Sequence, residues 1–164
     1  MWLPLVLGLG CGVAIVLGDR LFAARQSAAL GPGWGGFPHP QFPFSLIASA
    51  TAGIGEEVFF RLFVLSLWAL LLNLFLRRWQ ATRLALGIAN LIAALAFAAG
   101  HLPGVILMLG VEVAYQPMVL AELFLLNGLV GLVAGERFIR DGLVAAVGVH
   151  FWADIVWHVL WPLA

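Results

Sequence analysis

The sequence contains no lysine and very little charge of either sign. Only 10% of its 164 residues are charged, as eight Arg and eight acidic residues. A soluble domain of this size needs charged side chains at about a quarter of its positions. With 63% hydrophobic residues, the chain cannot form such a surface. This composition excludes the soluble enzymes and predicts an integral membrane protein.

Cysteine pairs and net charge are also missing. The single cysteine, Cys11, cannot close an intramolecular disulfide or supply a Cys pair for a metal. The formal net charge is zero, so the chain offers no basic field to a phosphate backbone, and we expect no nucleic-acid partner. The expected partners are membrane lipid and a substrate that reaches the membrane.

Long apolar runs make up most of the chain. A helix needs about 20 apolar residues to cross a bilayer core of about 30 Å. Five runs approach or exceed this length, and the segment 105–115 between them is too short, which favours a half-depth helix. We therefore predict an all-α polytopic membrane bundle with about five transmembrane helices and one short half-depth helix, as a single domain over residues 1–164. The five runs are 2–17, 44–76, 84–100, 118–135 and 143–160.

Glycine and proline predict where these helices bend or stop. Residues 31–43 carry Gly or Pro at eight of thirteen positions, which predicts a turn-rich loop. Its Trp34, Phe37 and Phe42 suit a membrane interface, and its His39 reads as a solvated or headgroup-facing side chain. The run 44–76 would be about 50 Å long as a straight helix, so we expect a break at Gly53 and Gly55. Pro103 is expected to end the run 84–100.

Ionisable side chains lie deep inside these apolar runs, where each costs about 2.5 to 3.5 kcal/mol at the centre of a membrane helix. They must face other helices or a wet cavity, and such a cluster is by default a candidate functional site. His101 lies at the end of a further run. The ionisable residues inside the apolar runs are Glu56, Glu57, Arg61, His150 and Asp154.

Helical spacing separates these groups. Glu57 and Arg61 are four residues apart on one face, which predicts a structural ion pair. Glu56 lies about 100° further round the helix, so it stays free and suits a general base that works near neutral pH. His150 and Asp154 share a face through the same four-residue spacing.

Other polar residues in the apolar runs receive simpler interpretations. His158 lies near the end of its run, where we expect a headgroup contact. The remaining acidic and amide side chains are expected to make interhelical contacts or to line a water path. These side chains are Glu112, Glu122, Asn73, Asn90 and Asn127.

Three short motifs resemble those of one protein family. Residues 56–61 resemble its EExxxR motif, residues 97–101 its FxxxH motif and residues 150–154 its HxxxN/D motif. In this order and on separate apolar segments, they are similar to the CAAX prenyl endopeptidase and bacteriocin-processing (CPBP, or ABI) family of intramembrane proteases. The resemblance covers residues 44–160, which would form the catalytic core.

The resemblance implies an intramembrane endopeptidase that needs no cofactor. Glu56 and His101 would activate a water molecule, His150 and Asp154 would stabilise the oxyanion, and Phe97 would pack beside the site. The substrate would be a membrane-tethered peptide or protein, with or without a prenyl group, and the location would be a prokaryotic cell (inner) membrane. The oligomeric state is not implied.

Asp154 stands where the family more often has Asn, and this departure leaves alternatives open. An ionised Asp cannot donate to an oxyanion, so Asp154 is either protonated or orients His150. A third reading is a zinc site in which two carboxylates and two imidazoles bind the metal. Its ligands would be Glu56, His101, His150 and Asp154. Buried carboxylates and imidazoles also suit a proton-coupled carrier, and a non-catalytic immunity or scaffold protein is a further alternative.

Overall fold

The computed structural model describes residues 2–31 and 36–164, apart from the side chains of residues 28–30. Every regular element in this part of the chain is a helix, and five helices are long and apolar enough to cross a membrane. The predicted all-α membrane bundle is therefore confirmed. These five candidate spans are Trp2–Ser27, Phe44–Trp79, Thr82–Leu109, Pro117–Asp141 and Leu143–Leu163.

The first helix, α1 (Trp2–Leu30), is longer than the apolar run that predicts it. It continues beyond Leu17, and two of the polar residues that follow are buried against the other helices: Asp19 is 5% exposed and Gln26 is 1% exposed. The predicted loop follows, although Trp34 lies outside the described residues.

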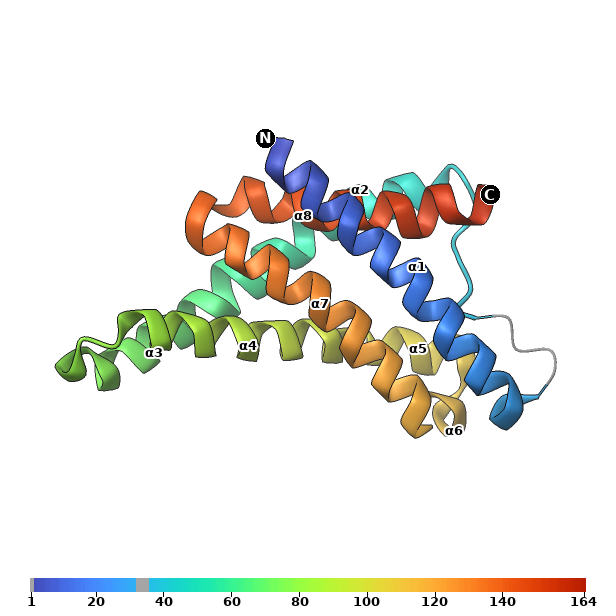
Figure 1. Ribbon diagram of the computed structural model, residues 1–164, viewed down its shortest axis with the longest axis horizontal. Coiled ribbons are helices and arrows are strands. Elements are labelled where there is room, and N and C mark those ends of the chain that lie inside the picture. The colour runs from blue at the N-terminus through green and yellow to red at the C-terminus, as the bar shows by residue number, and fades with distance from the viewer. Residues whose placement is uncertain (1, 32–35) are drawn as a thin grey trace.

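The second span bends, but not at the predicted glycines. Gly53 and Gly55 lie inside α2 (Phe44–Glu57), where the helix is continuous. A stretch of wider π-helical turns, η1 (Val58–Leu65), follows and leads into α3 (Ser66–Leu76). The chain changes direction between α2 and α3 (Figure 1). The expectation of a break at Gly53 and Gly55 is therefore wrong, and the π turns supply the irregularity instead.

The third span also departs from its prediction, because Pro103 does not end it. The helix α4 (Thr82–Gly100) is interrupted for one residue at His101, and α5 (Leu102–Leu109) starts directly afterwards. Proline is accepted there because the N–H groups of a first helical turn have no partner within the helix.

The segment 105–115 is not one half-depth helix. It is divided at Gly110, whose φ of 82° lies in the left-handed region that favours glycine. Its first part belongs to α5 and prolongs the third span, and its second part forms the four-residue α6 (Val111–Ala114).

The last two spans complete the bundle. The helix α7 (Pro117–Asp141) contacts α1, α4 and α8 (Leu143–Asp154), and α8 also contacts α1 and α2. In Figure 1, α1 and α7 run diagonally across the other helices. A second π-helical stretch, η3 (Ile155–Leu160), continues α8, and a short 3₁₀ turn, Trp161–Leu163, follows it.

Glycines allow these helices to approach closely. A Cβ added at Gly12 of α1 would lie 2.5 Å from the Cβ of Val156, in η3. A Cβ added at Gly131 of α7 would lie 3.0 Å from the Cα of Ala94 in α4. Such close contacts between small residues are typical of membrane helices, and here they hold α1 and α7 against the helices that carry the predicted site.

Amide side chains contribute to this packing in only some of the expected places. Asn90 of α4 donates to the backbone oxygen of Leu132 in α7 at 3.0 Å, which confirms the expected interhelical contact. Asn127 instead donates to Leu123 of its own helix at 2.9 Å, so the expected interhelical bond is absent there among the described residues. Glu112 is exposed.

Candidate active site

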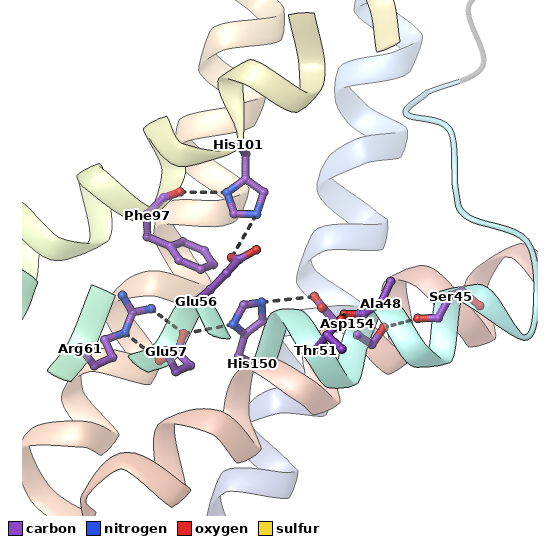
Figure 2. Close-up of polar contacts among 11 residues, drawn as sticks. Ser45, Ala48, Thr51, Glu56, Glu57, Arg61, Phe97, His101, His150 and Asp154 are labelled. Atoms are coloured by element: carbon purple, nitrogen blue, oxygen red, sulfur yellow. Dashed lines mark hydrogen bonds and ion pairs between the residues drawn. The ribbon is translucent and has the colours of Figure 1, made fainter. Parts of the chain in front are cut away.

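A cavity of about 380 Å³ lies between the helices, and all four predicted catalytic side chains line it. Glu56 comes from the end of α2, His101 from the joint between α4 and α5, and His150 and Asp154 from α8. Figure 2 shows the four side chains gathered in one region. The three motifs, separated by up to about a hundred residues, therefore converge as the sequence predicts.

Glu56 and His101 face each other at the cavity. The carboxylate Oε2 of Glu56 lies 3.8 Å from Nε2 of His101, and the two side chains are 36% and 32% exposed. This Oε2 has no hydrogen-bond partner. The other imidazole nitrogen, Nδ1, lies 2.8 Å from the backbone oxygen of Phe97, and since a carbonyl only accepts, Nδ1 carries the proton. In the neutral form of His101 with the proton on Nδ1, Nε2 is an acceptor that faces Glu56.

Glu57 has the opposite environment. It forms a two-point ion pair with Arg61, with Nε to Oε2 at 2.9 Å and Nη2 to Oε1 at 3.0 Å. Both side chains are 0% exposed. The predicted ion pair is present, and one of its two contacts, Nη2 to Oε1, is a charge-assisted hydrogen bond.

A further contact of Glu57 joins two of the motifs. Its Oε1 lies 3.0 Å from Nδ1 of His150, although the residues are 93 positions apart in the chain. The other ring nitrogen of His150, Nε2, lies 3.6 Å from Oδ1 of Asp154. The imidazole is thus held between two carboxylates from different helices (Figure 2). Helical spacing predicts the second neighbour but gives no signal for the first.

The ring of Phe97 lies at the centre of the site. It is 1% exposed, and it makes edge contacts with the imidazoles of His101 and His150 at centroid distances of 4.8 and 5.1 Å. The guanidinium of Arg61 lies 4.9 Å from the centre of the same ring. Phe97 therefore packs against both predicted catalytic histidines.

Both π-helical stretches begin directly after a carboxylate of the site. η1 starts after Glu57 and η3 starts after Asp154. Insertions of π geometry within α-helices are frequently found at functional sites. No sequence pattern predicted either of them.

The alternative zinc site finds no support in the geometry. Among residues 2–31 and 36–164, no group of three or more His, Cys, Asp or Glu side chains is arranged to hold a metal ion. The physical reason is that the side chains are divided between separate contacts: Glu56 faces His101, and His150 is held between Glu57 and Asp154. The four side chains of the zinc alternative are therefore not arranged around one metal position.

Further polar residues line the cavity, and among them Glu122 makes the expected interhelical contact, since it accepts a hydrogen bond from Gln26 of α1. Glu122 and His158 both line it, together with Trp157. His39 is half-buried, with its ring 4.5 Å from that of Trp157 and 5.6 Å from that of His158. His158 therefore lines the cavity, and His39 packs against it and against Trp157. The spacing of 150, 154 and 158 along one helix was the available signal for His158.

The comparison with protein families agrees with the motifs. The family model for type II CAAX prenyl endopeptidases, Rce1-like, matches residues 38–156, which include all three motifs. No curated protein and no solved structure gives a significant match. Since the model covers most of the chain, the protein belongs to the Rce1-like family of type II CAAX prenyl endopeptidases.

Proposed function

We propose that this protein is an intramembrane endopeptidase in which Glu56 is the general base. The observation that carries the proposal is the pair formed by Glu56 and His101. The Glu56 side chain is 36% exposed, and its Oε2, which has no hydrogen-bond partner, lies 3.8 Å from an imidazole nitrogen that can act as an acceptor at the same cavity. The family membership, which implies a protease, supports this function.

Two acceptors side by side suit the activation of one water molecule. The water would donate one O–H to Oε2 of Glu56 and the other to Nε2 of His101, so that its oxygen lone pairs point at the substrate carbonyl. As the oxygen attacks the carbonyl carbon, Glu56 takes the proton and later delivers it to the leaving amine. General base catalysis of this kind contributes about 10² to 10⁴-fold in rate.

His150 is placed to stabilise the tetrahedral intermediate. In the proposed mechanism it carries protons on both nitrogens: Nδ1–H donates to Glu57, and Nε2–H points toward the cavity for the oxyanion. Asp154, 3.6 Å from Nε2, balances the charge of the imidazolium. This arrangement supports the role in which Asp154 acts through His150, and it requires no metal ion or cofactor.

The substrate we propose is a peptide or protein held at the membrane. The cavity lies among helices that can span a bilayer, so a chain tethered by a lipid group or its own apolar segment would be concentrated near the site. Prenylation of the substrate and a prokaryotic cell (inner) membrane are part of this proposal.

The test is cleavage by the purified protein. We would incubate it in detergent with prenylated and unprenylated peptides and identify the products by mass spectrometry. Glu56→Gln and His101→Ala are expected to abolish cleavage while the proteins remain folded, and Glu112→Gln, at an exposed carboxylate, is the matched control. Retained cleavage by Glu56→Gln would refute the base assignment, and no cleavage by the wild type would favour a non-catalytic immunity or scaffold role.

A chelator separates glutamate chemistry from zinc chemistry. We expect cleavage to persist after treatment with 1,10-phenanthroline or EDTA, because the proposed roles of Glu56 and His101 need only a water molecule. Loss of activity that added zinc restores would establish the metalloprotease alternative. Proton-coupled transport in liposomes would establish the carrier.

A further inference from the structure

A second pair of acidic residues lies away from the three motifs, and one member of the pair, Glu122, lines the cavity. Asp19 of α1 and Glu122 of α7 are 5% and 2% exposed, and their carboxyl groups interact directly. Glu122 lines the same cavity as Glu56 and His101. The proposed mechanism of hydrolysis makes no use of either residue.

Hydrogen bonds satisfy only part of this pair. Gln26 donates through Nε2 to Oε2 of Glu122 at 2.7 Å, and the backbone N–H of Phe37 donates to Asp19. The other oxygens, Oδ1 of Asp19 and Oε1 of Glu122, are buried and have no donor among the described residues, and the two carboxyl groups hydrogen-bond to each other when one of them carries a proton. Two buried carboxyl groups in contact require either a shared proton or a cation.

The neighbouring basic residues do not supply that cation. Among the described residues, neither carboxyl group forms an ion pair. The charge of Arg20 acts on Asp19, but its guanidinium lies over the ring of Trp161, 4.2 Å from the centre. The charge of a protonated His39 would act on Asp19 as well, but burial lowers the pKa of this imidazole.

From these contacts we infer that Asp19 and Glu122 form a subsite that binds a basic side chain, Lys or Arg, of the peptide substrate. This inference rests on the proposed function and adds a specificity to it. Aromatic rings of Phe37 and Trp157 line the same cavity, and aromatic faces attract cations. A charge-assisted hydrogen bond to a carboxylate then favours Lys over an apolar side chain of the same length.

The test compares peptides that differ by one charge. Lys or norleucine, which has a similar length and no charge, is placed in turn at each of the two positions on either side of the cleaved bond. We expect the wild type to prefer Lys at one of these positions by about tenfold or more in kcat/KM. In Glu122→Gln the Lys-to-norleucine ratio should fall to near 1, and Asp19→Asn should change it in the same direction. Glu112→Gln, at an exposed carboxylate outside the cavity lining, should keep the ratio of the wild type.

Binding measurements separate this inference from the proposed function. Fluorescence anisotropy of labelled Lys and norleucine peptides, with Glu56→Gln protein in detergent, reports selectivity without cleavage. Tighter binding of the Lys peptide, lost in the double variant Glu56→Gln/Glu122→Gln, would support the subsite even if no peptide is cut. Equal binding and equal cleavage of the two peptides at every position would overturn it and leave a carboxyl pair that shares a proton. Preserved selectivity in both Glu122→Gln and Asp19→Asn would overturn it as well.

Discussion

Glu56 and Glu57 are neighbours in the chain but belong to two different regions of the molecule. Glu57 lies in a closed network with Arg61 and His150, 0% exposed and bonded to both. Glu56 is 36% exposed at the cavity, and its Oε2 has no hydrogen-bond partner. A buried carboxylate in a close ion pair with a guanidinium is held in one protonation state and position, whereas a carboxylate with only a 3.8 Å contact to an imidazole can accept a proton. The closed network around Glu57 therefore suits a structural role, and the open pair of Glu56 and His101 suits a catalytic role.

The largest effect should come from leaving the closed network with one uncompensated charge. Arg61→Met is expected to reduce the free energy of unfolding by about 3 to 5 kcal/mol, because Glu57 stays buried without its cation. Glu56→Gln, in the open region, should change it by less than about 0.5 kcal/mol. Unfolding in detergent with increasing SDS measures both. Equal losses of stability in the two variants would erase the distinction between the regions.

Removing both charges of the network should separate its support of the fold from its support of the site. Glu57→Met/Arg61→Met is expected to regain most of the stability, since apolar residues of similar volume often replace a buried ion pair without cost. Activity should still fall by about 10 to 100-fold, the usual effect of losing a carboxylate that orients a histidine, because His150 loses its partner. Wild-type kcat in the double variant would contradict the positioning role of Glu57.

A change in helix packing should destabilise the helices around both regions without changing the charge of any residue. Gly12→Ala is expected to cost about 1 to 3 kcal/mol of unfolding free energy, as overpacking usually does. Its Cβ would meet Ala153 and Val156. Gly10→Ala on the same helix, where nothing lies within 4 Å, is the matched control. A similar loss of stability in both variants would show that α1 does not pack against α8 and η3 as described.

The smallest effect is expected at the residue that faces both regions. Asp154→Asn should change kcat by less than about threefold, because an amide N–H can itself donate to an oxyanion. Asp154→Leu, which removes the polar group, should lower kcat by about tenfold or more. Rates with one peptide at several pH values measure both. A complete loss of activity in Asp154→Asn would show that the carboxylate itself is required.

The sequence predicts contacts within a helix better than contacts between helices. The pair Glu57–Arg61 follows from a four-residue spacing, which one helix determines by itself. The contact between Glu57 and His150 depends on how closely α2 and α8 pack, and no local pattern carries that information. The same holds for Asp19 and Glu122, which belong to α1 and α7. The convergence of the motifs was predictable only because ionisable side chains inside apolar runs must face other helices or a wet cavity.

Helix irregularities were predicted from the residues that usually cause them, and this is where the sequence misled. Gly53 and Gly55 permit a bend, but the helix α2 that contains them packs against α8 and stays regular. A proline ends a helix that would otherwise continue through it. Here α4 already ends at Gly100, and the new helix α5 starts at Leu102, one residue before Pro103. The π turns of η1 and η3 carry no residue signature, so they could be found only in the structure.

Phe97 has a consequence for how the site moves. Its ring touches both imidazoles and the guanidinium of Arg61 while it is 1% exposed, so it cannot rotate without displacing them. The half of the site that prepares the water and the half that receives the negative charge are thus mechanically coupled through one aromatic side chain. Thermal displacement of either histidine should be correlated with displacement of the other, and the site should gain or lose its working geometry as a whole.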